Sequence, residues 1–226
     1  MPYNTPMLPL RQRVPLVLAR LEAAYPDPPC GLDFTSPFTL AVATILSAQC
    51  TDKRVNLVTP ALFARFPTPQ AFAAAAPAEV EELVKTTGFF RMKAKSIRGF
   101  SRAIIEQHGG EVPGTLDELV QLPGIGRKTA NVVLGDAFGV PGITVDTHVG
   151  RLSRRLGWTA HTDPVKVEFA LMKRWPPTLW TRVSHQVILH GRAVCFARKP
   201  RCEGCTLADL CPKKGVTAKP TGERPA

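Results

Sequence analysis

The chain has 226 residues, 44% of them hydrophobic, which is enough for one or two domains with a packed core. Its 29 Lys and Arg residues outnumber 18 Asp and Glu residues, and the resulting net charge of +11 favours nucleic acid as a partner over a membrane. No segment approaches the roughly 20 apolar residues of a membrane span, and the proline-rich start lacks the apolar core of a signal peptide. We therefore expect an intracellular protein, in which clustered cysteines bind metal rather than form disulfides.

Apolar residues recur at helical spacing along the whole chain, and no stretch alternates as a strand would. The sequence therefore predicts an all-α fold, with Pro60 expected to bend or split its helix. The ends, residues 1–13 and 213–226, are polar or proline-rich and are expected to be disordered tails. Helices are predicted over residues 14–25, 38–48, 53–66, 69–76, 78–86, 91–108, 149–156, 164–175 and 179–194, with a short helix from 116 and a longer one whose first turn contains Lys128.

Residues 122–134, Leu-Pro-Gly-Ile-Gly-Arg-Lys-Thr-Ala-Asn-Val-Val-Leu, join these last two helices through a glycine turn. The short helix begins with a capping-box pattern, Thr-Leu-Asp-Glu, and Pro123 ends it. Ile125 can fill the gap between the helices, while Gly124 and Gly126 leave backbone amides open to an anion, most plausibly a phosphate. The nucleotide-hydrolase phosphate loop and the dinucleotide fingerprint are excluded, because Arg127 and Thr129 stand where those motifs need glycine.

Lys128 lies in the first turn of the outgoing helix, where the helix dipole disfavours a cation and favours the free amine. A free amine is what Schiff-base chemistry needs. Two alternatives are open: a hairpin that only binds a DNA backbone without catalysis, and a Lys128 that is an ordinary solvated surface lysine. Asp146, in the segment Val-Asp-Thr-His, is predicted to be the N-cap of the next helix.

Four of the six cysteines lie near the end of the chain, with the spacing Cys-x6-Cys-x2-Cys-x5-Cys: Cys195, Cys202, Cys205 and Cys211. Four thiolates suit one zinc ion or one iron–sulfur cluster, and the spacing leaves both open. Three basic residues lie on the loop that the first two ligands hold, which favours a phosphate contact over a solvated charge run: Arg198, Lys199 and Arg201. Cys30 and Cys50 are expected to be packing residues or free thiols.

In combination, the hairpin with Lys128, the Val-Asp-Thr-His segment eighteen residues later and the four cysteines resemble endonuclease III, the iron–sulfur DNA glycosylase family of base excision repair. Residues 46–52 and 110–113 fit as well, and the resemblance covers about residues 14–212. It implies two helical domains with a DNA groove between them. Residues 30–140 would form a six-helix domain with the helix-hairpin-helix, and residues 1–29 and 141–226 an iron–sulfur cluster domain.

The resemblance also implies the chemistry. Lys128 would be the nucleophile and Asp146 its acidic partner in a bifunctional DNA glycosylase/AP lyase that removes oxidised pyrimidines from duplex DNA and cuts the strand by β-elimination. The four cysteines would hold one 4Fe–4S cluster. The partner would be double-stranded DNA with damaged pyrimidines or abasic sites, and the protein a monomer in the cytoplasm, nucleoid-associated in a bacterium.

A flipped nucleotide leaves a hole in the base stack. By the resemblance, Gln49 would fill that hole, and Phe89 would be a second wedge at a position where the family usually has leucine, although Phe89 could also be a core residue. Ser47, Asp52 and His148 are candidates for the base pocket or, equally, local hydrogen-bonding residues.

Two other functions compete with this hypothesis. One is an adenine glycosylase of the same scaffold, which lacks the nucleophilic lysine and has a further C-terminal domain; Lys128 and the short stretch after Cys211 argue against it. The other is a non-enzymatic DNA-binding protein with a structural zinc ion.

Overall fold

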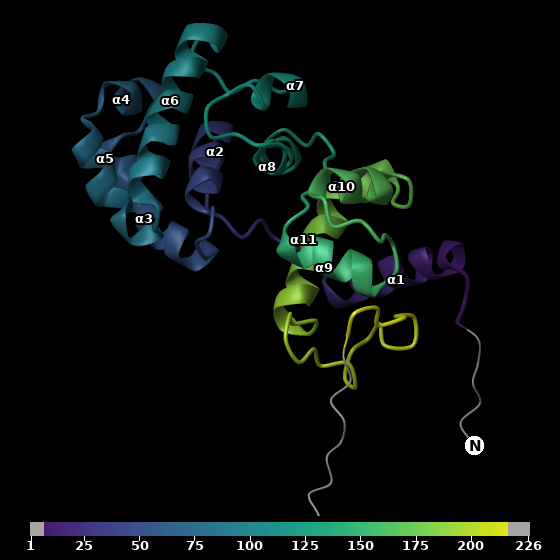
Figure 1. Cartoon of the computed structure of the whole chain (residues 1–226). Helices are drawn as coiled ribbons and strands as arrows, with labels where there is room; N and C mark the ends of the chain where they lie inside the picture. The colour runs from purple at the N-terminus through teal and green to yellow at the C-terminus, as the bar shows by residue number, and fades with distance from the viewer. Residues whose placement is uncertain (1–6, 217–226) are drawn as a thin grey trace, which may run out of the picture. The chain divides into compact units, whose positions relative to one another are not determined.

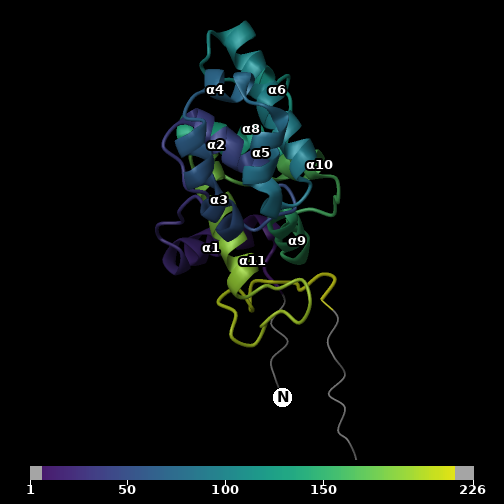
Figure 2. The same ribbon diagram turned by 90° about the vertical axis from the view of Figure 1, so that its left-hand side faces the viewer.

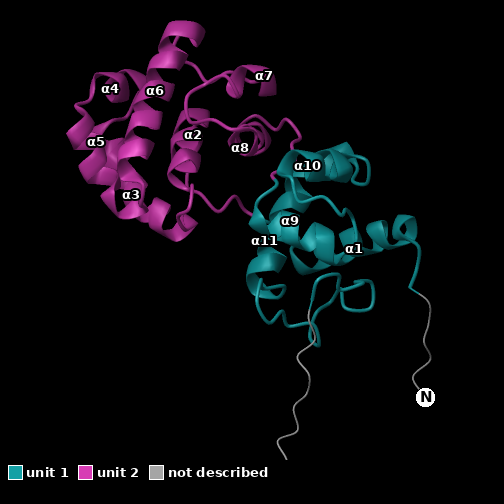
Figure 3. Cartoon of the chain, viewed as in Figure 1, with its two compact units in different colours: residues 1–28, 145–226 teal, residues 29–144 magenta. Residues whose placement is uncertain are grey.

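A computed structural model of the protein describes residues 7–216, and every regular element in that range is helical. The all-α prediction is therefore confirmed. The chain divides into two compact units: unit 2 runs from Pro29 to Thr144, and unit 1 combines the residues before and after it (Figure 3). In the described range no helix is long and apolar enough to cross a membrane.

Unit 2 is built around α2 (Pro37–Leu46), which contacts α3, α6 and α8 (Figures 1 and 2). All its residues from Phe38 onward are buried, as expected of a helix that is apolar on every side. Ser36 caps it by accepting the Thr39 N–H. The other elements are α3 (Asp52–Arg65), α4 (Pro69–Ala74), α5 (Pro77–Val84), a 3-10 turn (Lys85–Thr87), α6 (Phe90–His108), α7 (Leu116–Leu119) and α8 (Arg127–Ala137).

The local start signals of unit 2 act largely as the sequence predicts. Thr51 caps α3, and the Thr115 hydroxyl accepts the Glu118 N–H at the start of α7. Of the two expected effects of Pro60, the split is wrong, because α3 continues through it, and the bend stays a prediction. Pro60 is exposed, so water can reach the carbonyl that the missing proline N–H leaves unpaired.

Unit 1 packs α11 (Trp180–Ala193) against α1 (Leu10–Ala24) and α9 (Thr147–Arg155), with α10 (Pro164–Met172) on α9 and a 3-10 turn at Pro177–Leu179. Trp158 and Trp175 are buried in an edge-to-face pair with ring centroids 5.3 Å apart. Trp175 follows α10, so its apolar signal made the predicted helix three residues too long.

The predicted tails are partly wrong. α1 begins at Leu10, because the buried Arg13 guanidinium donates to the carbonyls of Leu8, Leu156 and Leu210, each at 2.9 Å. At the other end, Lys214 donates its N–H to the Arg155 carbonyl at 3.2 Å, so residues 213–216 are ordered against α9. The predicted disorder of residues 1–6 and 217–226 lies outside the described residues.

Candidate functional site

The two glycines of the hairpin turn between α7 and α8 differ in backbone conformation and in the space around them. Gly124 has φ +79°, and a Cβ there would lie 2.8 Å from the Ser96 Cβ, so only glycine fits. Ile125 is 4% exposed and belongs to the core of unit 2. Gly126 is the exposed N-cap of α8, and a Cβ there would meet nothing within 4 Å. The turn is thus fixed on one side and open on the other, where an anion could reach its amides.

Lys128 is the second residue of α8, and its side chain is exposed. The first-turn amides of a helix have no partner within the helix, so this amine stands beside a polar, electropositive backbone. On the buried side of α8, the Asn131 amide donates to the Ile143 carbonyl at 3.0 Å, and a Cβ at Gly142 would lie 2.9 Å from Asn131 Oδ1. Residues 142–143 are therefore packed tightly against the helix that carries Lys128.

Asp146 is the N-cap of α9, as predicted, and is half-buried. Its Oδ1 accepts the Val149 N–H at 2.8 Å. This bond fixes the carboxylate at the start of the helix and uses one of its two oxygens. The cap and a role in charge stabilisation are compatible, because a capping carboxylate has further acceptor positions.

Two of the candidate pocket residues have local partners. The Ser47 hydroxyl donates to the Thr44 carbonyl at 2.8 Å. His148 Nδ1 lies 3.0 Å from the Arg151 guanidinium and close to Gly191, where a Cβ would be only 2.7 Å away. Burial lowers the pKa of His148, and the Arg151 charge adds to this while Asp146 opposes it. Asp52 is half-buried at the start of α3. A place for these three in a base pocket remains a prediction.

Gln49 and Phe89 share an uncommon backbone conformation. Both lie in the left-handed region, with φ of 53° and 47°, and both are exposed. Such a conformation costs a non-glycine residue on the order of 1–3 kcal/mol and often marks a functional position. The Phe89 side chain is 59% exposed, whereas Phe90 packs against the core. The reading of Phe89 as a core residue is therefore wrong.

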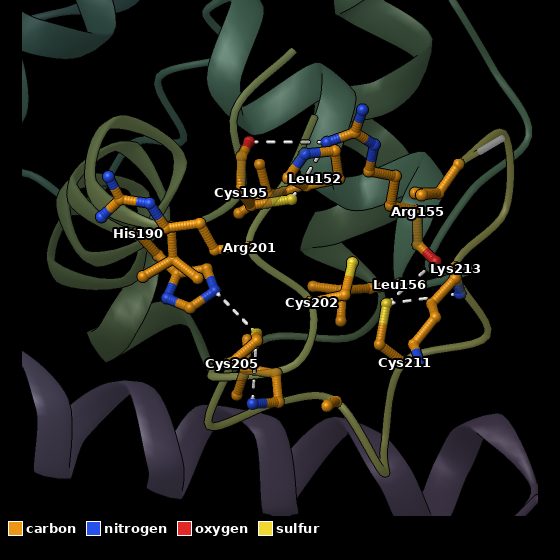
Figure 4. A pocket seen from close by; sticks show the side chains of 15 residues that line it. Leu152, Arg155, Leu156, His190, Cys195, Arg201, Cys202, Cys205, Cys211 and Lys213 are labelled. Carbon is orange, nitrogen blue, oxygen red and sulfur yellow. Dashed lines mark hydrogen bonds between the residues drawn. The ribbon is translucent and has the colours of Figure 1, made fainter. Parts of the chain in front are cut away.

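The four C-terminal cysteines surround one pocket of about 420 Å³, counting the space open to solvent (Figure 4). Within residues 7–216, no three His, Cys, Asp or Glu side chains converge tightly enough to hold a single metal ion. Four thiols that line one pocket are the ligand set of a 4Fe–4S cluster, so the donor set fits that group.

Hydrogen-bonding groups lie close to three of the four cysteine sulfurs, and those at Cys195 and Cys211 are N–H donors. Arg155 Nη1 lies 3.2 Å from Cys195 Sγ, and His190 Nε2 lies 3.4 Å from Cys205 Sγ (Figure 4). The backbone N–H of Lys213 is 3.4 Å from Cys211 Sγ. Such donors stabilise cluster thiolates and influence the redox potential of a cluster.

Sequence reasoning missed Arg155 and His190. Arg155 lies 40 residues before Cys195, and no motif spacing connects the two. His190 is also held by the Tyr25 hydroxyl, 3.2 Å from its Nδ1. Only its position five residues before the first cysteine could have suggested a role.

The basic loop between Cys195 and Cys202 is fixed at its base. Arg155 donates to the carbonyls of Phe196 and Ala197 at 2.6 and 2.9 Å. The loop's three basic side chains, Arg198, Lys199 and Arg201, are exposed, and Lys199 has a left-handed φ of 51°. The loop is thus a charged surface with a defined backbone, as a phosphate contact requires.

Cys30 and Cys50 are free, half-buried thiols that pack against the core of unit 2, as predicted. Burial, with the Asp136 carboxylate as the next cause, raises the pKa of the Cys30 thiol to about 12. Cys30 therefore stays a protonated thiol, which suits a packing residue and not a metal ligand.

Comparison with known proteins agrees with this geometry. Residues 42–177 match the HhH-GPD superfamily of base excision DNA repair proteins, and residues 195–211 match the iron–sulfur binding domain of endonuclease III. The second match rules out the zinc alternative, and the cofactor is one 4Fe–4S cluster.

Individual relatives cover nearly the whole chain. Endonuclease III of Synechocystis sp. is 56% identical over 203 residues, which are 89% of this chain and 93% of the relative. A trapped endonuclease III–DNA covalent intermediate has a TM-score of 0.87 at 43% identity, over 92% of this chain and 97% of that one. A thermostable thymine-DNA glycosylase, with a TM-score of 0.81 at 20% identity over 89% and 96% of the two chains, supports the fold alone. Its fold, its four cysteines and these similarities together place the chain in the endonuclease III family of HhH-GPD base excision DNA repair proteins.

Proposed function

We propose that this base excision repair DNA glycosylase/AP lyase removes oxidised pyrimidines from duplex DNA through a Schiff base at Lys128 and then cuts the strand by β-elimination. The observation that carries the proposal is the exposed Lys128 amine at the second position of α8, next to the open Gly126 turn. A relative at 43% identity is described as forming a trapped covalent intermediate with DNA, which supports a covalent route.

The chemistry follows from the amine and the carboxylate. With the damaged nucleotide flipped out of the stack, Lys128 Nζ attacks the C1′ carbon of the sugar and the base leaves with the bonding electrons. The Asp146 carboxylate stabilises the positive charge that grows on the sugar and assists proton transfer. The C1′–O4′ bond of this adduct then breaks, O4′ takes up a proton and the nitrogen loses one, which leaves an imine at C1′. The imine acidifies the C2′ proton, and its removal breaks the C3′–O bond with the 3′-phosphate as the leaving group. The same imine forms directly at an abasic site, which explains the lyase activity.

The rest of the site binds and opens the DNA. The amides of Gly124, Ile125 and Gly126 and the exposed loop residues Arg198, Lys199 and Arg201 would contact phosphates. Gln49 and Phe89 would enter the stack where the flipped nucleotide leaves it. Ser47, Asp52 and His148 would border the base.

The cluster domain provides the frame for the basic loop. Cys195, Cys202, Cys205 and Cys211 would hold the 4Fe–4S cluster, which supplies four covalent links between segments that otherwise have little regular structure. In this proposal, a unit of about residues 30–140 carries the hairpin and Lys128. A second unit, formed from both ends of the chain, carries the cluster and the basic loop.

The partner would be duplex DNA with damaged pyrimidines or abasic sites, bound by a monomer. A net charge of +11 and DNA-repair relatives from bacteria support a cytoplasmic, nucleoid-associated protein.

Borohydride trapping on DNA with one oxidised pyrimidine tests the nucleophile. Lys128→Gln should lose covalent trapping but keep DNA binding, because only the amine is removed. Lys53→Gln is the matched control, since Lys53 is also exposed and also the second residue of its helix, α3. Undiminished trapping by Lys128→Gln would overturn the assignment.

Asp146→Asn tests the carboxylate separately from the cap. Asparagine can still accept the Val149 N–H, so the helix start is kept while the charge is lost. We expect turnover to fall by about 10²- to 10⁴-fold, with an unchanged melting temperature. Wild-type turnover would restrict Asp146 to its cap.

A further inference from the structure

The turn that carries Phe89 is held by one buried lysine, Lys93. Lys93 is 4% exposed, and its Nζ donates to the Thr87 carbonyl at 2.7 Å. The backbone N–H of the same residue donates to the Phe89 carbonyl at 3.1 Å. Lys93 therefore bonds the chain on both sides of Gly88, at Thr87 through its side chain and at Phe89 through its backbone.

This turn needs such support because its conformation is strained. Gly88 has φ 72° and ψ 154°, a region that is essentially restricted to glycine. Phe89 follows at φ 47° and ψ 31°, which is rare for a bulky side chain. The two consecutive positive φ values turn the Phe89 ring outward while Phe90 enters the core. Without an external bond, relaxation of the turn to an ordinary conformation would lower the free energy of the chain.

The anchor of the turn is itself rigid. Thr87 is 2% exposed, and its hydroxyl donates to the Val84 carbonyl at 2.8 Å. Lys93 lies in the first turns of α6, the longest helix of unit 2, so its position is set by core packing. The Lys93 bond thus fixes the turn to the core, and the turn carries Phe89, which is 59% exposed.

A buried lysine is unfavourable unless its ammonium has partners. Burial lowers the pKa of Lys93, and Cys50, the neighbour of Gln49, is close enough to oppose this effect. An apolar residue would fill the same space without the desolvation cost. What the Lys93 ammonium provides and an apolar side chain could not is the bond to the Thr87 carbonyl.

We propose that Lys93 is a positioning residue for DNA opening, which holds the Gly88–Phe89 turn so that the Phe89 ring enters the base stack beside a flipped nucleotide. The inference rests on the proposed function, in which Phe89 is a wedge. Lys93 acts through Phe89 and does not itself touch the DNA. Preorganisation of the ring avoids the cost of ordering the turn during binding.

The test measures stacking rather than turnover. The duplex carries a tetrahydrofuran abasic analogue and 2-aminopurine as the opposite base, whose fluorescence rises when it loses its stacking partners. At saturating protein, Lys93→Met is expected to lose most of this rise. Lys95→Met, an exposed lysine on the same helix, removes the same charge and should keep it. Lys93→Arg should restore the rise in part, because it can still donate to the Thr87 carbonyl.

A double-mutant comparison separates this role from general stability. If Lys93 acts through Phe89, Lys93→Met combined with Phe89→Ala should lose no more of the rise than Phe89→Ala alone. Circular dichroism at the assay temperature confirms that each variant is folded. Should Lys93→Met fail to fold, Lys93→Arg and its combination with Phe89→Ala provide the same comparison.

The two possible failures look different. A wild-type rise in Phe89→Ala would show that Phe89 is not a wedge, and the proposed role of that residue would fall. A reduced rise in Phe89→Ala, together with a wild-type rise in Lys93→Met or an additional loss in the double variant, would overturn the positioning role alone.

Discussion

Arg155 Nη1 lies 3.2 Å from Cys195 Sγ, and the same guanidinium reaches the carbonyls of Phe196 and Ala197. The side chain comes from the last turn of α9 and is 7% exposed. It joins a helix of unit 1 to both the first cluster cysteine and the start of the basic loop. Cluster retention and loop geometry should therefore depend on one residue.

Replacement of Arg155 by lysine tests this dependence. Lysine keeps the charge but cannot reproduce the planar fork that bonds several acceptors at once. We expect the free energy of unfolding to fall by about 3 kcal/mol, because a charged hydrogen bond and buried carbonyls lose their partner. Iron content and visible absorbance per chain should fall with it. Arg154→Lys, at the neighbouring position, should have neither effect; equal iron loss in both variants would contradict the specific role.

The two hairpin glycines predict opposite results. Gly124→Ala should lower stability by about 1–3 kcal/mol from backbone strain, with further loss from the 2.8 Å approach to Ser96. Gly126→Ala should leave the melting temperature nearly unchanged, because its added methyl meets nothing, yet weaken DNA binding by covering the open amides. Thermal melting and binding titrations distinguish the two. Normal DNA binding by Gly126→Ala would remove this turn from the interface.

Charge reversal of Arg198 and Lys199 should flatten the salt dependence of DNA binding. If each contacts a phosphate, the slope of log K against log salt should fall in magnitude by about 2. Lys166→Glu with Lys173→Glu changes the net charge equally on exposed residues of the same unit. If this control flattens the slope equally, the effect arises from net charge and not from the loop.

Acid should destabilise the protein partly through His148. Burial holds the pKa of His148 below its ordinary value of 6.5. As the pH falls below about 6.5, the unfolded chain therefore binds the proton first, and the free energy of unfolding decreases. His148→Gln should lose less stability than the wild type between about pH 7.5 and 5, measured by melting temperature. His161→Gln, at an exposed position, should follow the wild type.

Features set by local chemistry could be predicted from the sequence. The caps at Thr51 and Asp146 each need only a short polar side chain and a backbone N–H three residues later. The hairpin glycines follow from backbone geometry in the same way. The cysteine spacing indicated four ligands, but the choice of an iron–sulfur cluster came from resemblance to a family.

Features set by distant contacts could not be predicted. The early start of α1 depends on Arg13, whose acceptors Leu156 and Leu210 lie 143 and 197 residues away. The role of Arg155 at Cys195 has the same origin. In the sequence, Lys93 is one of several basic residues between positions 91 and 108, and its burial depends on how Thr87 and Cys50 meet α6.

Unit 2 is one uninterrupted stretch, whereas unit 1 needs both ends of the chain. A ribosome makes the N-terminal end first, so the hairpin unit can fold as soon as Thr144 has emerged. Arg13 must wait for its acceptor at Leu210, and the last cluster cysteine follows immediately. Iron and sulfide can therefore be inserted only after Cys211 has left the ribosome, and until Leu210 has emerged α1 lacks one of its final partners.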